Sequence, residues 1–322
     1  MLIISSLMLG FILLTVIFLC CFVFFAYIWP VKTKKEKWSI GIYTGISPLA
    51  LNPPAQLTNP VLTAGDIRGM DAQFIADPFL IKEGAIWYLF FEVFNNSTRK
   101  GEIGLAASEN GFEWNFQRII LSEPFHLSYP HVFRWENEYY MIPESYEAKS
   151  IRLYKAVEFP FQWKYESTLL DKEAVDASVF FHSNRWWMFA SNPHHNNQLN
   201  LFFAKELYGP WREHPKNPLI RNNKHIARPG GRVTFFEDKI IRFAQDDWFV
   251  YGNKVRAFEI IELTETAYQE KLVSKELIAS RTGFGWNRSG MHHIDPLQID
   301  KDLWVAAVDG LGAVGKTRRI QR

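Results

Sequence analysis

The chain has 322 residues, a formal net charge of +2 at pH 7 and 22% charged residues. This composition excludes a disordered chain and gives no electrostatic attraction to nucleic acid, so no nucleic-acid partner is expected. The two cysteines, Cys20 and Cys21, are adjacent, which excludes a disulfide-stapled scaffold and a cysteine-ligated zinc site in the rest of the chain. Aromatic residues make up 16%, and because strands accommodate aromatic side chains well, we expect an all-β fold.

Residues 1–30 predict a transmembrane anchor. No charged residue lies between Leu2 and Trp29, and as a helix this stretch would measure about 42 Å, more than the ~30 Å hydrocarbon core. Tyr27 and Trp29 suit the membrane interface, and Pro30 ends the helix. A signal peptide is the rival interpretation, but the run is long, has no basic residue before it and no A-x-A site after it. We therefore expect a single-pass membrane protein that contacts the lipid bilayer through this helix.

A basic linker over residues 31–37 follows, with four lysines. The positive-inside rule then places the C-terminal domain on the cytoplasmic face. The N-x-S/T sequons at Asn95, Asn96 and Asn287 argue for the opposite side, although such sequons are frequent by chance. The prediction is a domain on the cytoplasmic face.

From about residue 38 to 310 the chain repeats one unit: an apolar strand, a polar turn, an aromatic strand and a third strand. Examples are ADPFLIKEGAIWYLFFEVF and VDASVFFHSNRWWMFASN, and most copies are separated by roughly 50 residues. The copies begin at Asp77, Ser128, Asp176, Arg228 and Asp295. This period is that of a β-propeller blade, whereas a β-sandwich, the alternative, would have turn signals without it. The sequence therefore predicts a five-bladed β-propeller over residues 38–310 and a basic tail over 311–322.

Ring closure is predicted to use the strand-like run Trp38–Pro48. The fifth copy has little chain after its inner hairpin, so this run is expected to pair with Leu303–Val308 and remove the exposed strand edges. Thr264–Ala279, before the fifth copy, looks helical and is expected to be an insertion.

Polar residues recur where first strands begin and second strands end, and in a propeller these positions converge at one mouth of the central channel. Carboxylates accept hydrogen bonds from sugar hydroxyls, and aromatic rings stack on sugar faces, so the pattern favours a carbohydrate or glycolipid ligand. The candidate catalytic residues are Asp77, Asp176 and Glu144. The candidate substrate-binding residues are Glu92, Tyr129, Arg228, Arg232, Asp246, His293 and Asp295. Arg228, Arg232 and His293 would hold an anionic group such as a phosphate or uronate.

Each candidate also has a scaffold role open to it. Asp77 and Asp295 precede prolines and could cap turns, and Asp176 could accept backbone N–H bonds. Glu144 could pair with Arg152, and Arg228 could hold a carboxylate of the next blade. No cofactor is expected. No metal is expected either, because strand neighbours such as His292 and His293 point to opposite faces.

Many short strings occur here in one order, among them GEIGLAAS, EPFHLSYPHVF, DASVF, WWMFAS, ARPGGR, RFAQD and GWNRSGMHHID. With them the chain resembles, from about Asp77 to Gly310, the N-terminal propeller domain of plant glucosamine inositolphosphorylceramide transferases. That domain is in turn similar to the five-bladed propellers of glycoside hydrolase families 43, 32, 62 and 68. The resemblance implies glycoconjugate metabolism and a membrane anchor. In that family the transfer of the sugar is assigned to a separate glycosyltransferase domain. We expect no such domain here, because the chain ends at Arg322.

The hydrolase resemblance is partial. Asp77 matches the acid at the start of the first blade, but the second blade begins with Ser128–Tyr129 rather than an acid, and Asp176 stands where a Glu is usual. We expect a membrane-anchored propeller that recognises or processes a glycan or glycolipid head group, with Asp77 as base or nucleophile and Asp176 or Glu144 as acid. The alternative is a non-catalytic carbohydrate-binding or scaffold module that partners a separate glycosyltransferase.

Overall fold

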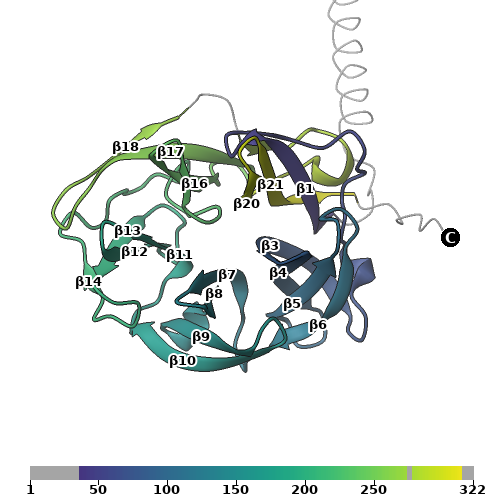
Figure 1. Cartoon of the computed structure of the whole chain (residues 1–322), viewed down its shortest axis with the longest axis horizontal. Helices are drawn as coiled ribbons and strands as arrows, with labels where there is room; N and C mark the ends of the chain where they lie inside the picture. Colours follow the sequence, from purple (N-terminus) through teal and green to yellow (C-terminus); the bar gives the residue numbers. More distant parts are fainter. Residues whose placement is uncertain (1–35, 274–277, 314–322) are drawn as a thin grey trace, which may run out of the picture. The chain divides into compact units, whose positions relative to one another are not determined.

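The structure, a computed structural model, describes residues 36–273 and 278–313. Over these residues it is a β-propeller of five antiparallel blades around a central axis (Figure 1). The predicted all-β, five-bladed fold is confirmed. The predicted anchor at 1–30 lies outside the described residues, as do most of the linker and tail. Among the residues that are described, no helix is long and apolar enough to cross a membrane.

The first strand of each blade lies nearest the axis, and the later strands lie progressively outward. The first blade contains β3 (Ala72–Glu83), β4 (Ile86–Asn95), β5 (Lys100–Ser108) and β6 (Asn115–Leu121). The second contains β7 (Ser128–Trp135), β8 (Glu138–Glu144), β9 (Ile151–Glu158) and β10 (Gln162–Leu170). The third contains β11 (Val175–His182), β12 (Arg185–Ser191), β13 (Leu199–Ala204) and β14 (Arg212–Glu213).

The last two blades depart from this simple order. The fourth contains β15 (Thr234–Phe236), β16 (Lys239–Asp246), β17 (Lys254–Leu263) and β18 (Tyr268–Leu272), with β19 (Ala279–Ser280) also pairing with β17. The fifth contains β20 (Ile294–Asp300), β21 (Leu303–Gly312), β1 (Lys37–Ser47) and β2 (Ala50–Asn52). Short 3-10 turns lie at Ala64–Asp66, Tyr146–Ala148 and Gly285–Asn287.

The N-terminal strand closes the ring, as the sequence predicts. β1 pairs antiparallel with β21 from Lys37↔Gly312 to Gly45↔Trp304. Ile40 and Ile42 on this strand are fully buried, in a cluster that joins the fifth blade to the first. Closure between the two chain ends therefore pairs the edges of β1 and β21, which would be exposed if the ring were open.

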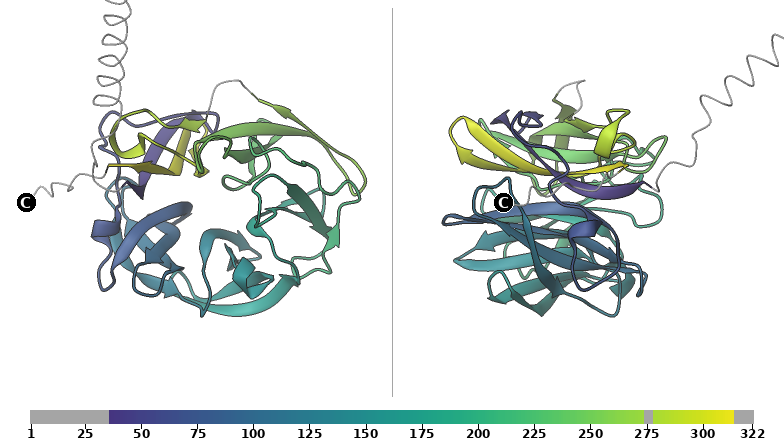
Figure 2. Two further views of the ribbon diagram at one scale, coloured as in Figure 1. Left: turned by 180° about the vertical axis from the view of Figure 1, so that it is seen from behind. Right: turned by 90° about the vertical axis from the view of Figure 1, so that its right-hand side faces the viewer.

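The hydrophobic core is divided among the interfaces between neighbouring blades. Each apolar cluster combines second- and third-strand residues of one blade with residues of the next; Ile142 and Met188, for example, belong to one cluster of blades two and three. The view from behind shows the blade sheets arranged around the axis (Figure 2, left). Because the apolar side chains pack between the sheets, the axial channel is left to the first strands and to polar groups.

The expectation that Thr264–Ala279 is helical is wrong. Tyr268–Leu272 forms strand β18 on the outer edge of β17, with Leu263 opposite Tyr268. The extended backbone lets Glu270 bind Arg242, a guanidinium that is only 1% exposed, at 2.7 and 2.8 Å. Satisfying this buried charge and pairing the free edge outweigh the helical propensity of the sequence. Residues 274–277 lie outside the described part.

Candidate functional site

The innermost strands of the first three blades share an unusual backbone feature at the same position. Asp77, Tyr129 and Asp176 have left-handed φ values of 52°, 44° and 55°. Each lies in a β-bulge, where the pairing with the second strand shifts register. A non-glycine residue in this conformation is strained, and bulges re-aim side chains next to functional sites. The sequence period located these three residues, but it could not reveal the bulge.

These bulges are joined to one another around the axis. The backbone N–H of Asp77 donates to Asp309 Oδ2 at 3.2 Å, and that of Tyr129 donates to Asp77 Oδ2 at 3.2 Å. The Tyr129 hydroxyl lies 2.7 Å from Ser178 Oγ and donates to the carbonyl of Gly231 at 2.9 Å. Hydrogen bonds therefore run from blade five through blades one and two to blades three and four.

Gly231 is required at the point where this network reaches blade four. Its φ is +140°, and a Cβ there would lie 1.7 Å from the carbonyl oxygen of Ile294. Only glycine fits this close approach between the fourth and fifth blades.

A cluster of buried polar residues lies at the end of the axial channel where the first strands begin and the second strands end. We call this cluster the funnel; it contains Asp77, Glu92, Glu144, Asp176, Arg228, His292, His293 and Asp309. Glu92 comes from β4 and Glu144 from the end of β8, at equivalent places in their blades. Each of these carboxyl-bearing residues is buried, and they are close enough to perturb one another's ionisation. Of the five residues expected to converge, Asp77, Glu144, Asp176 and Arg228 lie close together in the funnel, whereas Asp295 is bound to Arg232 outside it. That these residues form a functional site stays a prediction.

Asp176 and Arg228 form the main ion pair of the funnel. The Arg228 Nε contacts Asp176 Oδ2, and its second amino group lies 3.3 Å from Oδ1. Gln245 adds a donor to Asp176 at 3.0 Å, and the ring of Tyr251 lies 5.2 Å from the guanidinium. Arg228 therefore does hold a carboxylate, as the scaffold alternative proposed, although this carboxylate belongs to the preceding blade.

Asp309 and His292 form a second charged pair, from blade five. His292 Nδ1 lies 2.6 Å from Asp309 Oδ2, and the backbone N–H groups of His292 and His293 both donate to Asp309 Oδ1 at 3.0 Å. Burial opposes ionisation of His292, but the Asp309 charge raises its pKa to about 9. Burial likewise opposes ionisation of Asp309, but His292 holds its pKa below the usual range. At neutral pH this is an imidazolium–carboxylate pair.

Asp77, Glu92 and Glu144 have no such strong partner. Burial raises the pKa of Asp77 to about 7, and His292 only partly offsets this. Burial, with the nearby Asp176 charge, raises the pKa of Glu144 to about 8. Burial also raises the pKa of Glu92 well above its usual range, helped by the Asp77 and Glu144 charges. The funnel therefore holds carboxyl groups that exchange protons near neutral pH.

The free oxygen of Asp77 is the best-placed acceptor in the funnel. Its Oδ1 faces His292 Nε2 at 3.7 Å and His293 Nδ1 at 3.9 Å, beyond hydrogen-bond distance. Glu144 accepts single hydrogen bonds at 3.2 Å from Ser128 Oγ and from the backbone of Tyr146. Both side chains keep acceptor capacity that a ligand hydroxyl could use.

Two sequence expectations about this region are wrong. His292 and His293 do not diverge, because both precede β20 and their rings approach the same Asp77 oxygen. Glu144 does not pair with Arg152, whose guanidinium instead lies over the rings of Phe125 and Tyr165.

The predicted anion-binding set is also corrected. Burial lowers the pKa of His293 to about 3, so the ring is neutral at pH 7 and offers no charge to an anion. Arg232 is bound to Asp295 at 2.5 and 3.0 Å and to the carbonyls of Leu80 and Val132. Asp295 also accepts the Leu80 N–H at 2.6 Å. The Asp295–Arg232 pair thus ties blades five, four, one and two together.

Asp246 is bound within its own blade. Its carboxylate lies 3.0 Å from His225 Nδ1 and 2.9 Å from Arg256, and these partners hold its pKa below the usual range against the effect of burial. His292 and Asp309, which are not among the predicted site residues, belong to the funnel instead. The signal for Asp309 is its place at the end of the fifth blade's second strand, equivalent to Glu92 and Glu144.

One group of described residues could hold a metal ion. Asp77, His292 and Asp309 each offer a ligand atom, and these atoms all lie within 4.8 Å of one another. The 2.6 Å contact between His292 and Asp309 accounts for this grouping as an ion pair.

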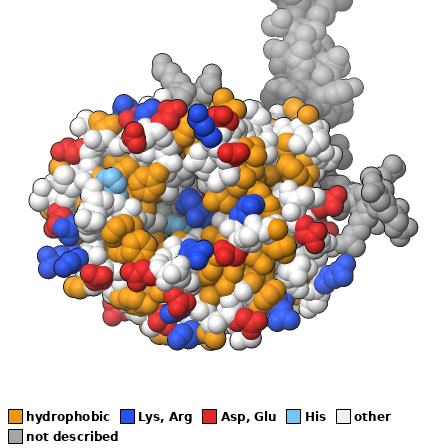
Figure 3. Space-filling view, viewed as in Figure 1, with side chains coloured by type: hydrophobic (Ala, Val, Ile, Leu, Met, Phe, Trp, Pro, Cys, Tyr) orange, Lys and Arg blue, Asp and Glu red, His pale blue; other side chains and the backbone are white. Residues whose placement is uncertain are grey.

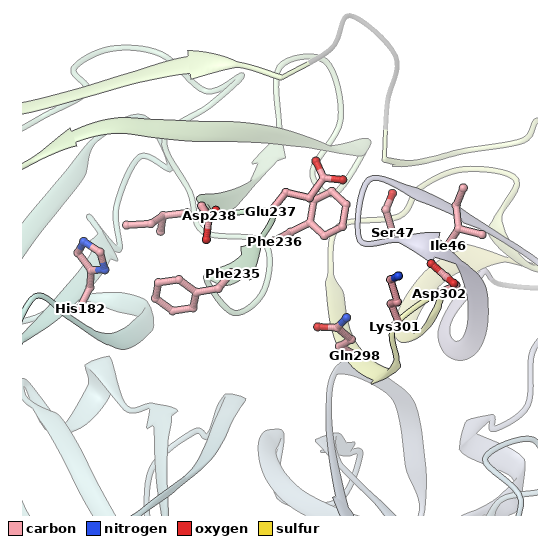
Figure 4. Close-up of a pocket in the computed structure, with 11 residues that line it drawn as sticks. Ile46, Ser47, His182, Phe235, Phe236, Glu237, Asp238, Gln298, Lys301 and Asp302 are labelled. Carbon is pink, nitrogen blue, oxygen red and sulfur yellow. The ribbon is translucent and has the colours of Figure 1, made fainter.

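A separate cavity of about 870 Å³ lies at the other end of the inner strands. It is bordered by the turns of the inner hairpins of blades four and five, with His182 and Phe235 on one side and Lys301 and Asp302 on the other (Figure 4). On the face seen in Figure 3, the centre of the propeller is hollowed and basic side chains border the hollow. None of the residues that line this cavity belongs to the funnel.

Comparison with known proteins places the chain in a family. Residues 31–311 match the family model described as "Glucosamine inositolphosphorylceramide transferase 1, N-terminal". The chain belongs to this family. The resemblance inferred from the sequence strings is therefore confirmed.

Curated relatives agree with the family match. The chain is 40% identical over 298 residues to glucosamine inositolphosphorylceramide transferase 1 of Oryza sativa subsp. japonica, and 36% identical over 301 residues to that of Arabidopsis thaliana. The match covers 86% and 87% of this chain but only 40% and 39% of those proteins. The chain thus spans about 40% of the length of the curated relatives it matches.

Solved structures share the propeller fold. A putative glycoside hydrolase from Parabacteroides distasonis matches with a TM-score of 0.58 at 10% identity, covering 82% of this chain and 98% of its own. The catalytic domain of the family 62 α-L-arabinofuranosidase of Coprinopsis cinerea matches with a TM-score of 0.56 at 12% identity, covering 87% and 98%. At these identities the likeness establishes the fold alone.

Proposed function

We propose that the propeller binds the sugar head group of a glycan or glycolipid in the funnel and acts on it through Asp77 and Glu144. The observation that carries the proposal is the trio of buried carboxyls, Asp77, Glu92 and Glu144, whose pKa values are raised into or above the neutral range. A scaffold gains nothing from buried acids without strong counter-charges, whereas acid–base chemistry at neutral pH needs them. Membership of a family named for glycolipid transfer supports a role in glycoconjugate metabolism.

The roles follow from the surroundings of each acid. Glu144, with a pKa near 8, keeps its proton at pH 7 and is the general acid toward a glycosidic oxygen. Asp77, with a pKa near 7 and an uncovered Oδ1, is the base or nucleophile. Asp176 is bound by Arg228 and Gln245, so we do not assign proton transfer to it. Its charge instead raises the pKa values of Asp77 and Glu144.

Two matched substitutions test this assignment. Asp77→Asn and Glu144→Gln keep the side-chain shape and remove the acid, while Asp171→Asn changes an exposed acid outside the funnel. Turnover of a head-group oligosaccharide should fall about 10²–10⁴-fold in the first two variants and stay unchanged in the third. Melting curves on the same samples establish that each variant folds. Unchanged turnover and unchanged sugar affinity in Asp77→Asn would remove Asp77 from the site.

The second candidate function is glycan binding without catalysis, in partnership with a separate glycosyltransferase. It is favoured by one observation: relatives named as transferases extend well beyond the 40% of their length that this chain matches. In this case the wild-type protein has no turnover, and Asp77→Asn weakens sugar affinity instead.

The proposal includes anchoring by residues 1–30. A chain held by an uncharged segment of this length should stay with the membrane through alkaline carbonate washing. Recovery of the full-length protein in the wash supernatant would contradict the anchor.

A further inference from the structure

The connection between β16 and β17 presents an apolar tip to solvent. Trp248, Phe249, Val250 and Tyr251 are consecutive and are 53%, 84%, 47% and 45% exposed. Hairpin connections are normally polar, and contiguous exposed apolar groups mark interaction surfaces. We call these four residues the aromatic tip.

The tip is held in place by specific contacts. Asp246 accepts the Trp248 N–H at 3.3 Å, and Asp247 accepts the Gly252 N–H at 2.7 Å, so the two acids brace both ends of the loop. The Trp248 ring stacks on His225 with centroids 4.9 Å apart. The loop is therefore held in one conformation by its own hydrogen bonds. Its apolar side chains stay exposed to solvent, and no other part of the described propeller buries them.

The tip adjoins both the funnel and the point where the chain enters the propeller. The Tyr251 ring lies 5.3 Å from His292 and 6.4 Å from Trp38, and Trp38 in turn stacks on His292 at 4.1 Å. Trp38 is the second residue of β1. The start of the first strand after the N-terminal segment thus lies against the tip.

The sequence before β1 identifies the surface that the tip would meet. Leu2 to Trp29 contains no charged residue, and only residues 30–36 separate it from β1. Fully extended, such a connector spans about 25 Å at most. A bilayer that holds the apolar segment is therefore within reach of the tip, and Trp and Tyr are the residues that favour the membrane–water interface.

We propose that the aromatic tip inserts into the head-group region of the membrane that anchors the chain, so that the funnel opens toward lipid head groups. This inference rests on the proposed anchor and adds to the proposed function the place where the substrate would be met, at the surface of the membrane. A soluble glycan would need no apolar surface beside the mouth. A protein partner on the same surface is the competing outcome, and the test distinguishes it.

The test uses the full-length chain with Cys20 and Cys21 changed to serine, reconstituted into phosphatidylcholine vesicles that contain nitroxide-labelled phosphatidylcholine. An environment-sensitive fluorophore is attached to Phe249→Cys or, as the matched control, to Ile46→Cys. Ile46 is also exposed, at 72%, but lies eight residues along β1 from Trp38 and borders the cavity at the other end. At about 3.3 Å per residue, Ile46 is roughly 26 Å from Trp38.

We expect lipid-borne nitroxide to quench the fluorophore at position 249 several-fold more than at position 46. Equal quenching at the two positions, or a protein that does not stay with the vesicles, would overturn the proposal. A change in emission at position 249 that appears only when a crude lysate is added, with no quenching by the lipid-borne nitroxide, would assign the surface to a protein partner and also overturn the proposal. Because no sugar is present, a failure here is separate from a failure of the proposed carboxyl chemistry.

A second readout links the tip to substrate choice. Phe249→Ser should lower the turnover or binding of a glycolipid in vesicles several-fold and leave that of the free head-group sugar unchanged. Ile46→Ser should change neither. Equal loss on both substrates would contradict the assignment of the tip to the lipid surface.

Discussion

Replacing Glu144 by glutamine isolates the effect of one buried carboxyl on the pH dependence of stability. The side chain is buried and accepts bonds from Ser128 Oγ and the Tyr146 N–H, both at 3.2 Å. Glutamine has the shape of the protonated acid, and its amide can accept from Tyr146 and donate to Ser128. The substitution therefore removes the titration while keeping the local packing.

The sign follows from the raised pKa. The folded protein holds the Glu144 proton up to about pH 8, whereas the unfolded chain releases it at the ordinary value of 4.5. Between these values the folded state binds more protons, so stability falls as the pH rises, by up to about 1.4 kcal/mol per pH unit. The glutamine variant does not pay this cost, and its advantage over the wild type should grow from pH 5 to pH 8 to a few kcal/mol and then level off.

Thermal or denaturant unfolding of both proteins at several pH values between 5 and 9 measures this difference. Other titrating groups are shared, so they largely cancel in the comparison. Glu109→Gln, an exposed acid in a turn, is the matched control and should follow the wild type at every pH. A Glu144→Gln variant whose advantage is constant with pH would refute the claim that burial keeps this carboxyl protonated.

Three further predictions concern the scaffold. Arg228→Met should cost about 3–5 kcal/mol by leaving the Asp176 carboxylate buried and unpaired, and adding Asp176→Asn should restore most of it in unfolding experiments; no recovery would contradict the pairing. Ile40→Ala, in the closing strand, should cost about 2–5 kcal/mol by the same measurement, and a loss below 1 kcal/mol would argue against closure there. Gly231→Ala should prevent normal folding, because its Cβ would lie 1.7 Å from the carbonyl of Ile294, and a wild-type melting temperature would show that this approach is not needed.

The fold was largely readable from the sequence because its period is long and each copy carries the same turn chemistry. Strand alternation and a spacing of about 50 residues predict blades, and an unpaired run at Trp38 predicts closure. The segment at Tyr268 misled because strongly helical residues were placed on a strand edge by a distant partner, Arg242. Such tertiary constraints leave no mark on local propensity.

The candidate site was readable in its positions but not in its pairings. Equivalent blade positions bring Asp77, Glu144 and Asp176 together, yet nothing in the sequence shows that Arg228 belongs to Asp176 rather than to another acid. His292 was set aside because the alternation rule assumes that the two histidines lie in a strand, whereas both precede β20. Asp309 was not chosen because its pairing with His292 leaves no mark on the sequence. These pairings decide which of the buried acids are charged at neutral pH and which keep a proton.

The central claim, that a sugar head group binds in the funnel against Asp77 and Glu144, is tested most directly by determining the structure with a head-group oligosaccharide bound. The account predicts sugar hydroxyl or glycosidic oxygens within about 2.6–3.2 Å of Asp77 Oδ1 and of the Glu144 carboxyl. A sugar bound instead in the cavity beside Phe235 and Lys301, with the funnel contacts of Asp77 unchanged, would contradict it.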